Sequence, residues 1–255
     1  MSHDDLEFHR KQSLNVLEHC LQSKPELEDV ILSIIVNKLG DQSKKVQCHT
    51  IYLLIKLSQA HMEMTPVIVH EVNQFITRSS VKSSHVYYSV AYLNRMAAMV
   101  APKDEKVRVM LLRIYFSLFK KLLNTDTNPD ELAPPVKKDR SKSKRENQRA
   151  AKAKPATNEL DQEDNKVAEL VLKGVNILMA KCSEQLFDST GGESSSAEMR
   201  RLIEEETMSL FRLAHHDVLR ISIQALKLLF QFARQQKKLK KTRGEIEIAH
   251  DDEGA

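Results

Sequence analysis

Apolar residues recur at helical spacing in two adjoining stretches near the start of the chain. The first stretch comprises Leu27, Val30, Ile31, Ile34, Ile35 and Leu39. It ends at Gly40, where a glycine can take the left-handed conformation that closes a helix. Asp41 or Ser43 is then placed to cap a second helix.

The second stretch has an apolar and a polar side. The first side is formed by Val46, Thr50, Leu53, Leu54 and Leu57, and the second largely by Lys44, Lys45, Gln47 and Lys56. Such a stripe packs against a neighbouring helix. The two stretches together predict a helical hairpin over about residues 26–60.

This spacing recurs further along the chain. Forty residues on, the same positions are Val86, Val90, Leu93 and Ala97, and the spacing returns at Ile221, Ala225, Leu228 and Phe232. Periods of about 40 to 47 residues with two helices each are typical of HEAT and armadillo-like arrays, whose units bury one face by stacking on their neighbours. We therefore predict an all-α fold, a HEAT/armadillo-like α-solenoid.

The remaining helices follow from the same periodicity. We expect an opening helix over 5–22, a second hairpin from Pro66 to about Val100, and a last hairpin over about 199–236 that turns at His215 and His216. The stretch 106–124 is apolar nearly all round, which predicts an inner helix covered on both sides. A helix over 166–182 is expected to pair with it.

A charged, proline-containing stretch interrupts the helical pattern between these last two helices. It lacks apolar periodicity over some forty residues, which predicts a long disordered basic insertion. A shorter flexible loop is expected at 188–198. The predicted organisation is N-terminal helical repeats over 1–124, a disordered basic linker over 125–164, C-terminal helical repeats over 165–236, and a charged flexible tail over 237–255.

The net charge of +4 at pH 7 is unevenly distributed. The linker holds nine basic and two acidic residues, and six further basic residues lie from Arg234 to Arg243. Without these residues, 24 basic and 33 acidic residues remain. The helical body is therefore acidic, and the positive charge lies in the two segments that we expect not to fold.

The three cysteines lie far apart and outside any Cys-x-x-Cys motif. They predict neither a disulfide framework nor a zinc site, and we expect Cys20, Cys48 and Cys182 to be buried apolar residues in a reducing compartment. The sequence shows neither a signal-peptide core nor an uncharged run of 18 residues. We therefore expect a soluble intracellular protein without a membrane partner.

No motif for catalysis, phosphate binding or metal binding is present, so we expect no enzyme activity, no cofactor, no metal and no small-molecule substrate. His215, His216 and Asp217 are interpreted as a helix cap or turn rather than as metal ligands or acid–base groups, because adjacent helical residues point in different directions. His61, His70 and the pair Cys48 and His49 are equally weak as ligand sets.

Two groups of residues are candidates for nucleic-acid contact. Tyr87, Tyr88 and Tyr92 invite an RNA-stacking interpretation, but their helical spacing favours core or groove positions. The basic segments suit nuclear import or contact with phosphate groups without base specificity. These candidates are Lys137, Lys138, Arg140, Lys142, Lys144, Arg145, Arg149, Lys152, Lys154, Lys237, Lys238, Lys240, Lys241 and Arg243.

Four segments resemble, in order, the CCAAT-binding-factor or nucleolar-complex family of ribosome-assembly proteins. They are residues 52–96, IYFSLFKKLL at 114–123, KGVN at 173–176, and residues 210–231, with a charged insertion between the second and third. The resemblance implies a nuclear, nucleolar helical-repeat scaffold in early assembly of the large ribosomal subunit (pre-60S). Its implied partners are another protein of the family, pre-60S proteins and rRNA.

Family members are longer, so the chain resembles a middle portion of them, as a shortened or partial member would. Two other functions remain open. The family's name suggests a CCAAT-box transcription regulator, although the chain has no DNA-reading helix motif. A generic helical-repeat adaptor, such as a transport factor, also fits the fold.

Overall fold

The computed structural model describes residues 6–23, 27–125, 159–187, 193–216 and 218–252. Every regular element in these ranges is helical, so the predicted all-α class is confirmed. The elements are α1 (Glu7–Ser23), α2 (Glu28–Asn37), η1 (Lys38–Gly40), α3 (Lys44–Ala60), η2 (Met62–Met64), α4 (Thr65–Thr77), α5 (Ser83–Met99), α6 (Glu105–Thr125), α7 (Glu159–Phe187), α8 (Glu193–Ala214) and α9 (Leu219–Asp252).

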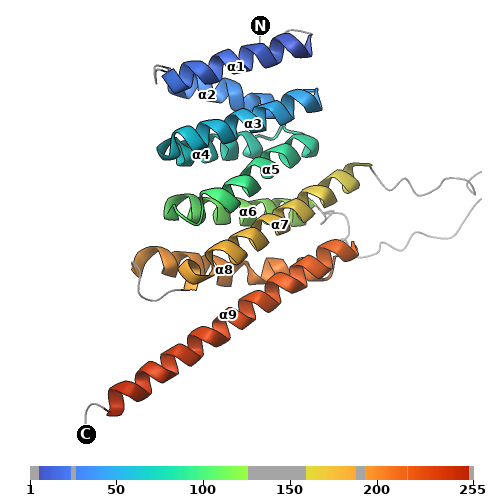
Figure 1. Ribbon diagram of the computed structural model, residues 1–255. Helices are drawn as coiled ribbons and strands as arrows, with labels where there is room; N and C mark the ends of the chain where they lie inside the picture. The colour runs from blue at the N-terminus through green and yellow to red at the C-terminus, as the bar shows by residue number, and fades with distance from the viewer. Residues whose placement is uncertain (1–5, 24–26, 126–158, 188–192, 217, 253–255) are drawn as a thin grey trace, which may run out of the picture.

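The helices form a two-layered stack (Figure 1). In one layer α1, α3, α5, α7 and α9 contact each other in succession, and in the other layer α2, α4, α6 and α8 do the same. The odd-numbered helices run in the same direction, with α1 at one end of the stack and α9 at the other (Figure 1). Each helix buries a face against its neighbours along the stack, which is the arrangement of an α-solenoid.

The apolar stripes identified from the sequence line the contacts between layers. All five apolar-side positions of α3 are buried, as are the four repeated positions in α5 and the four in α9. Gln47 was expected on the polar side, but it is buried, and its side-chain amide donates to the carbonyl oxygen of Asp41 at 2.7 Å. Positions of α3 and α5 that lie forty residues apart in the sequence are therefore buried in the same way.

The junction between α2 and α3 differs from the prediction. Gly40 ends the short helix η1, and its φ lies outside the left-handed region. A Cβ there would lie 3.1 Å from Cζ of Phe75, so close packing accounts for this glycine better than backbone conformation does. Ser43 stands at the N-cap of α3, but its hydroxyl donates to Glu7 of α1 at 2.6 Å and makes no cap bond.

Asp41 has a different role at this junction from the predicted helix cap. Its carboxylate accepts the backbone N–H of Ser43 at 2.9 Å and pairs with Arg10 of α1 and with Lys38. The side chain of Asp41 is nearly buried, so these contacts replace the water that its charge loses. They connect α1 to the turn before α3.

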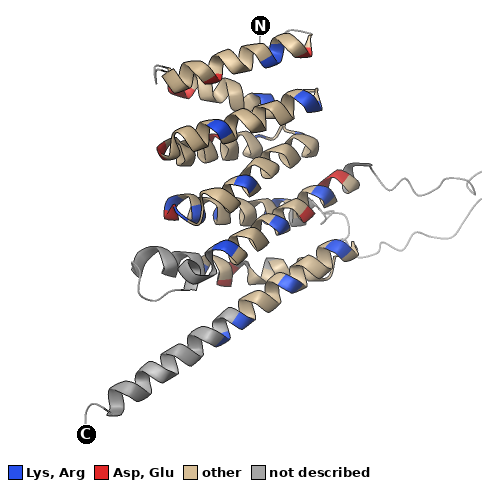
Figure 2. Ribbon diagram, in the orientation of Figure 1, with Lys and Arg blue, Asp and Glu red and all other residues tan. Residues whose placement is uncertain are grey.

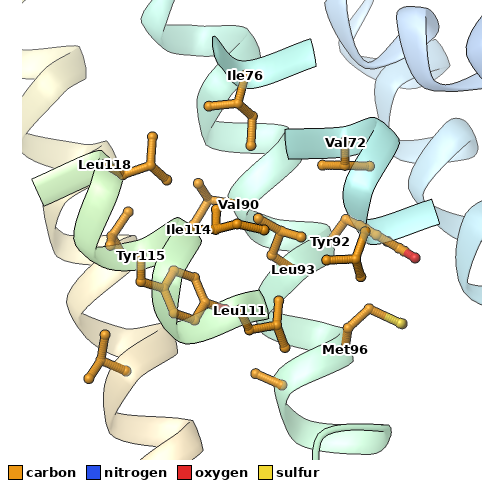
Figure 3. Close-up of a cluster of buried hydrophobic side chains, with 14 of the residues drawn as sticks. Val72, Ile76, Val90, Tyr92, Leu93, Met96, Leu111, Ile114, Tyr115 and Leu118 are labelled. Carbon is orange, nitrogen blue, oxygen red and sulfur yellow. The ribbon is translucent and has the colours of Figure 1, made fainter. Parts of the chain in front are cut away.

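Helix α6 lies inside the stack, as its all-round apolar sequence predicts. It contacts α4, α5, α7 and α8. Its buried apolar residues are Val107, Leu111, Leu112, Ile114, Tyr115, Phe116, Leu118 and Phe119. Figure 3 shows several of them packed against Val72 and Ile76 of α4 and Val90, Leu93 and Met96 of α5. The buried side chains labelled in this cluster therefore come from α4, α5 and α6.

Helix α7 contacts α6, the predicted pairing, but it packs most extensively on α5. Gly174 of α7 makes this possible, because a Cβ there would lie 2.3 Å from Oδ1 of Asn94 and 2.5 Å from Cζ of Tyr115. Asn94 accepts the Tyr115 hydroxyl at 2.8 Å and donates to the carbonyl oxygen of Leu170 at 2.9 Å. One buried asparagine thus joins α5, α6 and α7.

Three predicted boundaries differ from the structure. Helix α7 begins at Glu159, inside the predicted linker 125–164, of which residues 126–158 lie outside the described part. Its acidic first residues suit a helix N-terminus, where the helix dipole favours negative charge. Helix α8 begins at Glu193 within the predicted loop 188–198, of which residues 188–192 are not described. Helix α9 continues to Asp252, so the predicted flexible tail is helical as far as that residue.

The prediction of buried cysteines is wrong for Cys20 and Cys48, which are both exposed. Each lies next to the apolar stripe of its helix rather than on it: Cys20 precedes the buried Leu21, and Cys48 follows the buried Gln47. The side chain of Cys182 lies outside the described residues.

Candidate interaction surfaces

The helices of the odd-numbered layer begin along one edge of the stack (Figure 1). A shallow groove of about 170 Å³ lies at this edge, between the N-terminal parts of α3, α5 and α7. It is lined by Lys44, Ser83, Ser84, Tyr87, Tyr88, Glu163 and Lys166. An adjoining depression is lined by Ser79, Val81, Ser83, Val86, Leu118, Lys121, Leu122, Asp164 and Val167.

A hydrogen bond separates the two depressions and fixes the groove. The hydroxyl of Ser83, the first residue of α5, donates to the carboxylate of Asp164 in α7. The two residues are 81 positions apart in the chain, so this contact holds the start of α7 beside the start of α5 across the insertion. This contact forms part of one wall of the groove, and the sequence alone does not predict it.

The three tyrosines of α5 occupy different environments. Tyr92 is fully buried and shares a hydrogen bond of 3.0 Å with Ser58 of α3, and burial raises the pKa of its hydroxyl. Tyr87 and Tyr88 line the groove with their rings edge to face and 5.6 Å apart. All three tyrosines therefore occupy core or groove positions, as their helical spacing favoured.

The groove and the adjoining depression together carry one excess positive charge. Lys44, Lys166 and Glu163 line the groove, and Lys121 and Asp164 line the depression. A single excess charge creates little attraction for an RNA backbone, whose binding depends on a larger excess of positive charge. The groove is better suited to a partner that offers both polar and aromatic contacts.

Only some of the basic residues that are candidates for nucleic-acid contact or nuclear import belong to the described part of the chain. Lys137, Lys138, Arg140, Lys142, Lys144, Arg145, Arg149, Lys152 and Lys154 lie outside the described residues. Lys237 is exposed on α9, and Lys238, Lys240, Lys241 and Arg243 belong to the same helix without a described side chain. Helix α9 contacts α7 and α8 but, among the described helices, neither α3 nor α5, which supply most of the groove residues.

Large apolar side chains are exposed at the end of the stack that α8 and α9 form. They are Met208, Phe211, Leu219, Ile223, Leu226 and Phe230. This surface was not predicted from the sequence, although Leu219, Ile223, Leu226 and Phe230 recur at helical spacing beside the repeated buried positions of α9. A large exposed apolar patch is a common sign of an interaction site.

The histidine pair between α8 and α9 acts as the predicted turn. Nδ1 of His216 accepts the backbone N–H of Val218 at 3.0 Å, and the carbonyl oxygen of His216 accepts the hydroxyl of Ser222 at 2.6 Å. Within the described ranges, no cluster of three or more potential metal-ligating side chains occurs. None of the helices in those ranges is long and apolar enough to cross a membrane.

Curated proteins related to this chain match nearly all of it. Protein SLOW WALKER 2 of Arabidopsis thaliana is 28% identical over 92% of the chain, and ribosome biogenesis protein NOC1 of Chaetomium thermophilum is 29% identical over 90%. Human CCAAT/enhancer-binding protein zeta is 26% identical over 92%. No protein-family model matches the chain.

The chain spans only part of each relative. It covers 21% of the Arabidopsis protein, 20% of the Chaetomium protein and 18% of the human protein. A Drosophila melanogaster relative, nucleolar complex protein 1, matches 46% of the chain at 29% identity. The three matches that cover 90% or more of the chain run through α-helices on both sides of the insertion, and they confirm its resemblance to CCAAT-binding and nucleolar-complex proteins.

Proposed function

We propose that this chain is a non-enzymatic scaffold of HEAT/armadillo-like repeats in nucleolar assembly of the large ribosomal subunit. The observation that carries the proposal is the similarity over 90% of the chain to a protein named for ribosome biogenesis, NOC1 of Chaetomium thermophilum. A match of this extent includes most of the chain rather than one motif. The fold supports the proposal, because stacked helices offer long surfaces for binding other macromolecules.

The protein partner is proposed to be another nucleolar-complex protein of the pre-60S particle. The name nucleolar complex protein 1 of the Drosophila relative supports an assembly of several proteins. Two surfaces of the stack are available to such a partner, the groove beside Tyr87 and Tyr88 and the apolar end formed by α8 and α9.

A second function is favoured by one observation. The human relative is named CCAAT/enhancer-binding protein zeta, and that name indicates binding to promoter DNA. The described helices give this function less support. The exposed Arg and Lys residues of α9 lie beside apolar side chains, rather than among polar side chains that could contact the edges of nucleotide bases.

Affinity purification of the full chain from its own cells distinguishes these functions. We expect enrichment of large-subunit precursor proteins together with rRNA. Enrichment of promoter DNA without ribosomal precursors would contradict the proposal and favour transcriptional regulation. Recovery of transport cargo without rRNA would favour a generic adaptor instead.

RNA binding is proposed to come from the two basic segments. Replacing the nine bases between Lys137 and Lys154 by glutamine is expected to lower affinity for unrelated RNAs about equally, since phosphate contacts carry no sequence information. The slope of log affinity against log salt should fall by about 0.7 for each single-strand phosphate that the variant no longer neutralises. Filter binding over a salt series measures both quantities.

The matched control changes two lysines of the groove, Lys44→Gln and Lys166→Gln. Because Glu163 and Asp164 offset these charges, we expect the control to keep its RNA affinity and its salt slope. If the control bound RNA more weakly while the linker variant kept its affinity, RNA binding would belong to the folded groove.

A further inference from the structure

The helices of the odd-numbered layer differ in charge from those of the even-numbered layer. Helices α3 and α5 contain no Asp or Glu, and neither do residues 170–183 of α7 or 219–244 of α9. Every even-numbered helix contains at least one acidic residue, and the sequence of α8 contains several. The stack therefore has a basic layer, although its body as a whole is acidic.

The exposed side chains of this layer point outward from the stack. Helices α3, α5 and α7 each have a neighbour of the same layer on both sides, and even-numbered helices contact them from a third side. Side chains that remain exposed on these three helices therefore point away from the even-numbered layer. This outward side belongs to the middle of the stack, so its exposure does not depend on which helix comes first or last.

Three exposed basic side chains lie on the outward side. Arg95 of α5 directly follows Asn94, and Lys173 of α7 directly precedes Gly174. Because Asn94 and Gly174 are in close contact, Arg95 and Lys173 lie on adjoining parts of their helices. Lys181, about two turns further along α7, is also exposed. These three side chains, here called the basic track, have no ion-pair partner among the described residues.

Little acidic charge opposes the basic track. The acidic residues in the first part of α7 end at Glu169, one turn before Lys173, and Glu163 and Asp164 lie at the groove edge. Helix α9, the next helix of the layer, adds exposed Arg and Lys residues and no acidic residue before Glu245. Figure 2 shows the red segments of α7 near its start and blue segments along α3, α5, α7 and α9. The excess of positive charge is therefore larger here than at the groove.

An exposed aromatic ring lies on the outward side of α3. Tyr52 is 60% exposed, and its ring stacks on that of His49 with the centroids 6.2 Å apart. An exposed ring of this kind can hold a nucleotide base by stacking, whichever base it is. Basic side chains combined with exposed rings are typical of surfaces that bind single-stranded nucleic acid.

We infer that the outward side of α3, α5 and α7 binds single-stranded RNA. The basic track contacts phosphate groups, and Tyr52 stacks on a nucleotide base. This inference rests on the proposed function, because it adds a folded RNA contact to the two basic segments already proposed. It assigns RNA to the basic layer and leaves the groove for a protein partner.

A polypeptide suits this surface less well than RNA does. The linker of this chain carries nine basic and two acidic residues, so the basic track repels it. An acidic polypeptide, whether from the same protein or from another, supplies carboxylates but no nucleotide ring to stack on Tyr52. RNA supplies both a regular row of phosphate groups and rings for stacking.

Charge removal on the full chain tests the basic track. Arg95→Gln, Lys173→Gln and Lys181→Gln are combined in one variant, and fluorescence anisotropy follows the binding of an unpaired RNA oligonucleotide over a salt series. The slope of log affinity against log salt should fall by about 2, because three single-strand phosphate contacts are lost at about 0.7 each. The affinity itself should fall at least about tenfold.

The matched control removes the same charge from the even-numbered layer. Lys106→Gln of α6 is combined with Arg201→Gln and Arg212→Gln of α8, all at exposed positions. This control should keep the salt slope and the RNA affinity of the wild-type chain. Circular dichroism checks that both triple variants keep their helical content.

A second pair of variants tests stacking and identifies the occupant. Tyr52→Ala should weaken RNA binding by about tenfold without changing the salt slope, whereas Tyr52→Phe should bind RNA as the wild-type chain does. A polyglutamate peptide is the probe for an acidic polypeptide. It should bind more weakly than the RNA, and Tyr52→Ala should not change its affinity.

Two results would overturn the inference. If the basic-track variant binds RNA with the same slope and affinity as the control, the outward side does not contact RNA. If polyglutamate binds as tightly as RNA and Tyr52→Ala weakens neither, the surface belongs to an acidic polypeptide. The proposed function is judged separately. If the basic-track variant matches the control while glutamine substitution of the linker still lowers RNA affinity, this inference fails and the RNA contact of the basic segments stands.

Discussion

Replacing Gly174 by alanine should lower the free energy of unfolding by about 2 to 4 kcal/mol, the sum expected for overpacking and a disrupted buried hydrogen bond. The added methyl group would lie 2.3 Å from Oδ1 of Asn94 and 2.5 Å from Cζ of Tyr115. Helix α7 must therefore move away from α5 and α6, or the bond between Tyr115 and Asn94 must break. The higher helix propensity of alanine offsets only about 1 kcal/mol of this loss.

Urea unfolding followed by circular dichroism measures the effect. Lys173→Ala is the matched control, because it lies one residue away on the exposed side of α7 and should change stability by less than about 0.5 kcal/mol. In the Gly174→Ala background, Asn94→Ala should cost less than it does in the wild-type chain, because it removes one of the clashing atoms. Unchanged stability of Gly174→Ala would show that α5 and α7 do not approach this closely.

Phe119→Ala should destabilise the protein by about 3 to 5 kcal/mol, the range for removing a large aromatic side chain from a core. Phe119 is fully buried on α6, and its ring lies 6.0 Å from that of Phe116. The contacts of α6 with four other helices leave little freedom for the cavity to collapse.

The same unfolding experiment on Ser117→Ala supplies the control, since Ser117 is exposed on this helix. Its stability should match that of the wild-type chain within about 0.5 kcal/mol. A loss below about 1 kcal/mol for Phe119→Ala would contradict the inner position of α6, because core aromatic truncations cost more.

Periodicity predicted most of the fold, because each helix buries a stripe that its own sequence displays. The buried positions of α3, α5 and α9 follow from spacing alone. Helix α6 was recognised as an inner helix for the same reason. The two-layered order of the stack also follows from short connections between successive hairpins.

Local capping was harder to predict, because distant residues compete for the capping groups. Glu7, which is 36 positions away, accepts the hydroxyl of Ser43 that was expected to cap a helix. Gly40 has a packing role that depends on Phe75 of α4, and Gly174 depends on side chains of two other helices. Such tertiary contacts leave no periodic signal in the sequence.

The candidate surfaces were predicted unevenly. Charge runs identified the basic segments. Helical spacing favoured core or groove positions for Tyr87, Tyr88 and Tyr92, and the structure shows that Tyr92 is the buried one. The groove could not be predicted, since it forms only when α7 starts beside α5 across the insertion. The residues Leu219, Ile223, Leu226 and Phe230 of α9 recur at helical spacing, but only the structure shows that these four side chains are exposed.

A role in large-subunit assembly can be tested by depleting the protein in its own cells and separating ribosomal subunits on a sucrose gradient. We expect a fall of free large subunits relative to small subunits, restored by the wild-type chain and by Lys173→Ala. Gly174→Ala should restore the ratio less well at elevated temperature, because it weakens the stack. An unchanged ratio of large to small subunits after complete depletion would contradict the proposed function.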